Sequence, residues 1–263
     1  MEYIDELSVL FQERLSQIFN LSRLPLNIIN ASQSPLNSIS SSLDEISGSH
    51  STKSKINNQI ASIRNIAKNK DIQRQFELFN SQIVVLMVGA LEAQLYDVVK
   101  AIGDHNPEIF TFEENGSKPK IITFEASLLN EKTSVGEIMR HYFKEKDGGV
   151  SFQDIQSIVR FFADKLQCDL EIEDYKEILI YATAVRNVTV HNNQIIDKRF
   201  LSQIRDTAFI SIVEEDDNGD EVKRFTDGKL LNITESDIRE IKEALLSFIS
   251  EISFKIKDNY ESQ

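Results

Sequence analysis

Residues 76–102 read FELFNSQIVVLMVGALEAQLYDVVKAI, and this stretch decides the fold of the 263-residue chain. From Ile83 to Leu91 every position is apolar or small, so a helix built from these residues has no polar face. Such a helix is buried by other elements on all sides. The apolar run ends at Glu92 and is too short to cross a bilayer. The stretch therefore predicts a central helix in the core of a soluble protein that has no membrane-spanning segment.

Segments with one apolar face flank the central stretch on both sides. Apolar residues recur at helical spacing in residues 3–19, 56–63, 135–146, 152–162, 175–190 and 234–252. The last segment starts with Thr234, and Asp237 three residues later completes a capping pair. Two β-prone runs, 208–213 and 222–225, flank Asn218-Gly219, which is a strong turn signal. The predicted fold class is mainly α, with a small β-hairpin before the last helix.

The chain is predicted to have two parts. Only 9 Gly and 4 Pro are present, so turn-forming residues are scarce and long helices are favoured. Residues 31–55 contain ten serines and are predicted as a linker, which makes residues 1–75 an N-terminal helical extension with a Ser-rich linker. Residues 76–263 form the main helical domain, in which Pro and Gly mark an irregular insertion at about 103–133.

The cysteine content and the amino terminus indicate the compartment. Cys168 is the single cysteine, so the chain has no internal disulfide and no CxxC pair for a thiolate zinc site. The first six residues, MEYIDE, have neither a basic region nor an apolar run and predict no secretory signal. We expect a cytoplasmic protein in a reducing compartment, without a metal ion or another cofactor.

The charge of the chain is strongly negative but uneven. The net charge is −13 and the pI about 4.9, which weighs against a general nucleic-acid binder because phosphate affinity comes from clustered Lys and Arg. Residues 53–74 hold six basic residues and one acid, whereas six of the eight residues 214–221 are acidic. The basic cluster is either an RNA contact or a solvated helix face, and the solvated face is the default interpretation. Any RNA contact has to be sought on a local patch.

Polar residues that suit a phosphate site lie in residues 181–197, which read YATAVRNVTVHNNQIID. Asn187 and His191 are four residues apart, so they share one face of the predicted helix, and the amide can orient the imidazole. The long side chain of Arg186 can reach over the helix end towards the same anion. The spacing therefore predicts a phosphate site at the carboxyl end of this helix.

The string Arg-Asn-Val-Thr-Val-His at residues 186–191 resembles the signature of the HEPN superfamily, an Arg, a polar residue, three further positions and a His on a late helix of a small α-bundle. The resemblance is closest to the prokaryotic branches of toxin-antitoxin and abortive-infection systems, in which a Gly and an Asp follow the motif. Asn192-Asn193 and Asp197 fit this pattern, and Gln194 stands where glycine is expected. The resemblance extends over about residues 76–257 and implies an HEPN-like helical bundle.

The resemblance implies metal-independent cleavage of RNA, in which the ribose 2′-hydroxyl attacks the adjacent phosphodiester. This reaction needs a proton acceptor, a proton donor and a cation for the charge that builds on phosphorus. One His and one Arg are not enough, so a homodimer with twofold symmetry is expected to bring two copies together. His191 then acts in acid/base catalysis, Arg186 stabilises the phosphate and Asn187 orients the histidine.

The same resemblance implies the biological class. We expect a toxin or phage-defence effector that has RNA as its substrate. Its protein partners would be a second copy of the chain and an antitoxin or a defence-complex protein. No membrane, metal ion or cofactor takes part in this interpretation.

Five further residues are weaker candidates. Glu92 and Asn192 are candidate supporting residues around the catalytic group, although a helix-surface glutamate with Lys100 about two turns away is the ordinary interpretation of Glu92. Three basic residues either widen the rim for RNA contact or carry ordinary surface charge: Lys198, Arg199 and Arg205. The other histidines have no neighbouring ligand pattern, so no metal site is predicted.

Two other functions stay open. The first is a catalytically silent HEPN protein that serves as a dimerisation or sensing module in a defence complex, with residues 1–75 used for partner binding. The second is an all-α interaction protein outside the family, in which the motif is accidental. Substitution of Arg186 or His191 would then change stability but no activity. For either alternative, a fold shared with a family of nucleases does not by itself establish catalysis.

Overall fold

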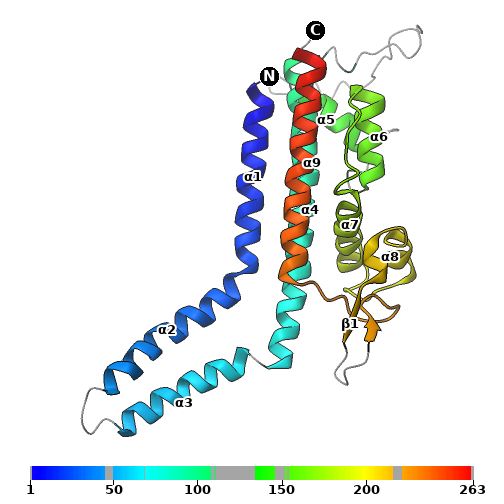
Figure 1. Cartoon of the computed structure of the whole chain (residues 1–263). Helices are drawn as coiled ribbons and strands as arrows, with labels where there is room; N and C mark the ends of the chain where they lie inside the picture. The colour runs from blue at the N-terminus through cyan, green and yellow to red at the C-terminus, as the bar shows by residue number, and fades with distance from the viewer. Residues whose placement is uncertain are drawn as a thin grey trace.

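The protein is mainly helical, as the sequence predicts (Figure 1). The computed structural model describes residues 2–44, 50–67, 69–107, 110, 134–145, 152, 154–215 and 221–261. Within these ranges the elements in chain order are α1 (Glu2–Ser22), α2 (Leu24–Asp44), α3 (His50–Ala67), α4 (Lys70–His105), α5 (Val135–Glu145), α6 (Ile155–Leu166), α7 (Lys176–His191), α8 (Lys198–Gln203), the 3-10 helix η3 (Ala208–Ser211), β1 (Val213–Glu215), β2 (Glu221–Lys223) and α9 (Glu235–Glu261).

Helix α4 is the centre of the molecule, which confirms the prediction made from residues 76–102. It packs against α1, α5, α7 and α9. The side chains of Ile83, Met87 and Leu91 are completely buried. The helix starts before the apolar stretch because the side chain of Asn69 accepts hydrogen bonds from the backbone N–H groups of Asp71 and Ile72. The apolar middle of α4 is thus covered by other helices on several sides, not on all sides as the stretch alone predicted, because Leu86 is 49% exposed.

The apolar character of α4 also bears on whether it could span a membrane. By length and composition it is the one helix among the described residues that passes as a candidate membrane span, with a mean hydropathy of 1.5 over 18 residues. Within the protein, 61% of that window is buried. Burial of this kind is the property of a core helix in a folded domain.

Helices α1 and α9 run beside α4 and complete the long bundle (Figure 1). The Nε2 atom of Gln94 on α4 donates to the carbonyl oxygen of Leu7 at 2.8 Å, which ties α1 to the core. The predicted cap of α9 is confirmed. The Thr234 backbone N–H donates to an Asp237 carboxylate oxygen at 2.7 Å, and the Asp237 N–H donates to the Thr234 hydroxyl at 3.2 Å.

The Ser-rich linker prediction is wrong for the described part of residues 31–55, which is helical. Helices α2 and α3 lie side by side and project away from the bundle (Figure 1). Serine hydroxyls are accommodated because they donate to carbonyls one turn earlier, as Ser32 does to Ile28 at 2.8 Å. Ser40 donates instead to the Asn57 side chain across the pair at 2.8 Å. We call α2 and α3 together the arm.

The strand prediction for residues 208–213 is largely wrong. Residues 208–211 form the 3-10 helix η3, because the Phe209 ring stacks on Tyr181 of α7 with centroids 4.2 Å apart. Strand β1 follows at Val213–Glu215 and pairs antiparallel with β2, Val213 opposite Lys223. The Asn218-Gly219 turn lies outside the described residues.

The predicted insertion at 103–133 lies mostly outside the described residues as well. Its first residues, 103–105, are not irregular but form the last turn of α4. Gly103 lets α5 approach this turn closely, because a Cβ atom on Gly103 would lie 2.8 Å from the Cα atom of Gly136. The last turn of α4 therefore takes part in the contact with α5.

Candidate functional site

The motif residues lie at the end of a buried helix. Helix α7 packs against α4, α8 and α9, and all five residues from 181 to 185 are buried. The helix emerges from the core only in its last turns, where Arg186 and Asn187 are half-buried and His191 is exposed. The fold thus holds the predicted catalytic residues on a rigid support and presents them at the surface.

The three predicted catalytic side chains are brought together. Nη1 of Arg186 donates to Oδ1 of Asn187 at 3.0 Å and lies 3.5 Å from Nε2 of His191. The contact with the imidazole expected from Asn187 is therefore made by Arg186. A guanidinium can only donate, so Nε2 is the acceptor in a hydrogen bond between these two groups. Asn187 positions the arginine, and the arginine contacts the histidine.

A small pocket opens beside His191, with a volume of about 90 Å³, enough for a few water molecules. Helices α7 and α8 and the turn between them form its wall, with the side chains of Asn187, Val188, His191, Asn192, Asp197, Arg199, Phe200 and Gln203. Asp197 starts α8, because its Oδ1 atom accepts from the Phe200 N–H at 2.7 Å. This cap sets the direction in which α8 presents its side chains to the pocket.

Only one of the three predicted basic contacts reaches this pocket. Arg199 lines it together with Gln203, which lies one helical turn further along α8. Lys198 and Arg205 are exposed outside its lining, and Arg205 lies 3.4 Å from the carboxylate of Asp206. Gln203 was not identified from the sequence. Without the fold, nothing in the sequence indicated that Gln203 lies on the same helix face as Arg199.

The turn after His191 forms without the glycine that the resemblance expects. Asn193 and Gln194 have φ values of +49° and +65°, in the left-handed region that glycine adopts most easily. The buried Gln194 side chain donates from Nε2 to the Leu78 carbonyl of α4 at 3.3 Å. Nδ2 of Asn192 donates to the Ile195 carbonyl at 2.6 Å, so Asn192 shapes the turn as well as lining the pocket.

Glu92, the other candidate supporting residue, is half-buried on α4. Burial raises the pKa of Tyr96, and the negative charge of Glu92 one turn away raises it further. The hydrogen bonds that the structure gives to Arg186 go to Asn187 and His191. The role of Glu92 as a supporting residue of the catalytic group stays a prediction.

Other kinds of site find little support in the described part of the chain. No group of three or more His, Cys, Asp or Glu side chains there could hold a metal ion. Cys168 is buried, and burial raises the pKa of its thiol to about 11. A thiol with this pKa is a poor nucleophile near neutral pH. The pocket beside His191 is therefore the best candidate for chemistry.

Comparison with known proteins adds no further guide to this site. No protein-family model, no curated protein and no solved structure matches the chain.

Proposed function

We propose that this chain is a metal-independent endoribonuclease of HEPN type. The observation that carries the proposal is the convergence of Arg186, Asn187 and His191 beside a pocket that Arg199 also lines. This set combines a group that can exchange protons near neutral pH with two cations that can neutralise a phosphate. A small pocket suits a phosphate better than a whole nucleotide, so the bases and sugars would lie outside it.

The proposed reaction leaves a 2′,3′-cyclic phosphate and a 5′-hydroxyl. His191 takes the proton of the ribose 2′-hydroxyl, and the 2′ oxygen forms a bond to phosphorus. The bond between phosphorus and the 5′ oxygen breaks, and that oxygen takes a proton from a second imidazole. Arg186 and Arg199 stabilise the charge on the phosphate oxygens in the transition state.

The second imidazole would come from a second copy of the chain. Val190 and Ile195 are 48% and 45% exposed although both are apolar, and they stand on either side of His191 in the sequence. Apolar side chains beside the motif suit a twofold interface that places two helix ends together. A homodimer is therefore part of the proposal.

A toxin or phage-defence effector in the cytoplasm is the biological role that we propose. An antitoxin or a defence-complex protein would then restrain or recruit the nuclease. The helical bundle, which includes α1, would be HEPN-like, with the arm as an extension that projects from it.

The test is cleavage of total cellular RNA and tRNA by the purified protein in EDTA. We expect cleavage with cyclic phosphate ends, and we expect His191→Ala to lower the rate by about a hundredfold or more. His141→Ala is the matched control, because this histidine lies on α5, outside the pocket lining. Equal cleavage by the wild type and His191→Ala would overturn the proposal.

A catalytically silent HEPN module is the second candidate. It is favoured by one observation, namely that Arg186 lies against the Nε2 atom that a general base would use. A folded dimer that cleaves no RNA, with or without magnesium, would support this role. Sedimentation of the same protein sample measures whether the dimer forms.

A further inference from the structure

The turn after His191 is held by a second segment of the chain. We call residues 224–234, between β2 and α9, the clasp loop. The Ile196 N–H donates to the Lys229 carbonyl at 2.9 Å, and the Gly228 N–H donates back to the Ile196 carbonyl at 2.8 Å. The Leu231 N–H donates to the Gln194 carbonyl at 2.8 Å. The backbone of this turn is therefore paired with the clasp loop over several residues.

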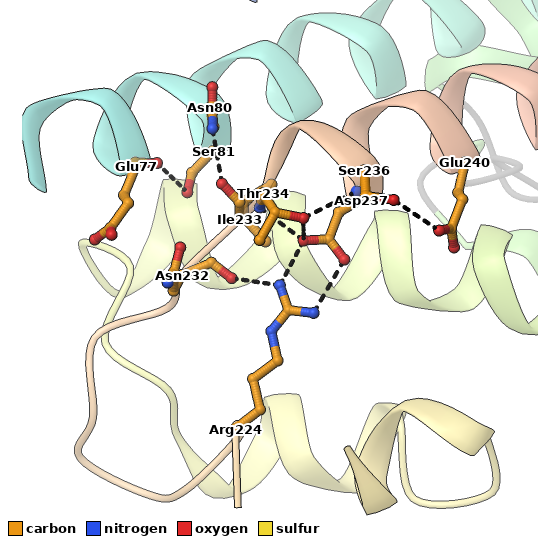
Figure 2. Close-up of polar contacts among 10 residues, drawn as sticks. All are labelled: Glu77, Asn80, Ser81, Arg224, Asn232, Ile233, Thr234, Ser236, Asp237 and Glu240. Carbon is orange, nitrogen blue, oxygen red and sulfur yellow. Dashed lines mark hydrogen bonds and ion pairs between the residues drawn. The ribbon is translucent and has the colours of Figure 1, made fainter. Parts of the chain in front are cut away.

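A buried ion pair joins Arg224, the first residue of the clasp loop, to Asp237 in the first turn of α9. Figure 2 shows the Arg224 guanidinium pointing at the Asp237 carboxylate, and both side chains are only 7% exposed. Nη1 of Arg224 donates to Oδ1 at 3.1 Å, while Nη2 donates to Oδ2 and to the Asn232 carbonyl. The arginine thus binds the carboxylate with two nitrogens and the loop backbone with one of them.

The same carboxylate belongs to the cap of α9. Asp237 Oδ2 accepts from both the backbone N–H and the hydroxyl of Thr234, each at 2.7 Å (Figure 2). Nδ2 of Asn80 donates to the Ile233 carbonyl at 2.8 Å, which ties the loop to α4. The carboxyl end of the clasp loop is therefore fixed to α4 and α9, and its first residue, Arg224, is fixed to α9 through Asp237.

Stability alone is a weak reason for a buried ion pair. Desolvation of two charges offsets much of their attraction, and apolar side chains of similar size often stabilise a protein as well. A guanidinium bound to a carboxylate through two nitrogens instead favours one geometry over its neighbours. Here that geometry sets the path of the loop that pairs with residues 194–196.

We propose that Arg224 and Asp237 form a positioning pair for His191. By fixing the clasp loop they fix the turn after α7, and through it the place of His191 relative to Arg199 on α8. The consequence for RNA cleavage rests on the proposed function. The consequence for the turn does not, because it is a property of the folded chain.

The first experiment measures amide hydrogen exchange at Gly228, Ile196 and Leu231. We expect Asp237→Asn to speed exchange at these amides about tenfold or more relative to amides in the middle of α4. Asparagine still accepts a hydrogen bond from Thr234, so the cap of α9 is retained. Thr234→Val is the matched control, because it removes the hydroxyl and keeps the ion pair. Unchanged exchange in Asp237→Asn would overturn the proposal.

A double variant guards against loss of folding. Arg224→Met with Asp237→Leu removes both charges, so no lone charge is left buried. We expect this variant to fold and to show the same fast exchange at Gly228, Ile196 and Leu231. Wild-type exchange at all three amides would show that packing, not the ion pair, positions the turn.

The second experiment observes His191 itself. We expect Asp237→Asn to move the imidazole NMR signals of His191 in the folded state relative to those of the wild type. If the wild type cleaves RNA, we expect kcat to fall about tenfold in Asp237→Asn. Unchanged imidazole signals and an unchanged kcat in a variant with fast exchange would remove the positioning role. Absence of cleavage by the wild type would count against the proposed function only, since the exchange and NMR results stand without activity.

Discussion

The bundle and the arm are both built from helices, but they are stabilised differently. In α4 the side chains of Ile83, Met87 and Leu91 are completely buried. In α2, by contrast, no side chain that the structure describes is buried, and in α3 Ile60 is the one buried apolar side chain among those described. The arm depends on the pairing of its two helices and on exposed polar contacts. Helix formation thus says little about how much free energy a segment contributes to the whole fold.

The largest expected effect is a truncation in the bundle core. We expect Leu91→Ala to lower the free energy of unfolding by about 3 to 4 kcal/mol, because it leaves a cavity in the middle of α4. Leu86→Ala is the matched control on the same helix, since Leu86 is 49% exposed, and we expect less than about 0.5 kcal/mol. Urea denaturation followed by circular dichroism measures both. Equal losses of unfolding free energy in Leu91→Ala and Leu86→Ala would mean that the Leu91 side of α4 is not buried in the core.

A truncation in the arm should have a smaller and local effect. We expect Ile60→Ala to lower the free energy of local opening of α2 and α3 by about 1 to 2 kcal/mol, because its surroundings hold few apolar atoms. Amide exchange in the arm should speed up while the urea midpoint of the bundle stays the same. Ile39→Ala, at a site 47% exposed, should change neither. A shift of the bundle midpoint in Ile60→Ala would show that arm and bundle unfold together.

The smallest effect in this series depends on pH. Burial alone would raise the pKa of Asp104, but hydrogen bonds from Lys100, Ser134 and the Gly136 N–H hold it below its ordinary value of 3.8. The contribution of this carboxylate is therefore complete above the ordinary pKa and is lost as the pH falls through the lowered value.

Asp104→Asn tests this contribution at the junction of α4 and α5. We expect a loss of about 1 kcal/mol at neutral pH and, as the pH falls below the ordinary pKa of 3.8, a shallower loss of stability than in the wild type. Urea unfolding at several pH values measures the slope. The arm is the internal control, because residues 24–67 contain only two acidic residues and its exchange should respond little to this substitution. If the free energy of unfolding of Asp104→Asn and of the wild type changed with pH in parallel, the pH dependence could not be assigned to Asp104.

The sequence predicted the bundle better than the arm, for a physical reason. An apolar stretch such as 83–91 and a capping pair such as Thr234 and Asp237 carry their structural cause within a few residues. The serines of residues 31–55 do not, because their helices form against each other, through contacts such as Ser40 with Asn57. The 3-10 helix at 208–211 likewise follows from a ring contact with Tyr181, far away in the sequence.

The candidate site could also be predicted only in part from the sequence. The spacing of Arg186 and His191 was enough to predict that both lie at the end of one helix, but not that Asn187 would contact the arginine. The choice of Arg199 over its basic neighbours depends on the direction of α8, which Asp197 sets. The pairing of Arg224 with Asp237 joins residues 13 positions apart and has no sequence signal of its own.

The clasp loop also has a consequence for how the protein is made. Translation proceeds from the amino terminus, so residues 194–196 leave the ribosome before residues 228–231, with which they pair. At roughly 5 to 20 residues per second, the delay is on the order of seconds. During this interval α7 and His191 already exist as part of the nascent chain, while the segment that holds the following turn is still being synthesised. The final geometry of the site is therefore among the last features that a new molecule acquires.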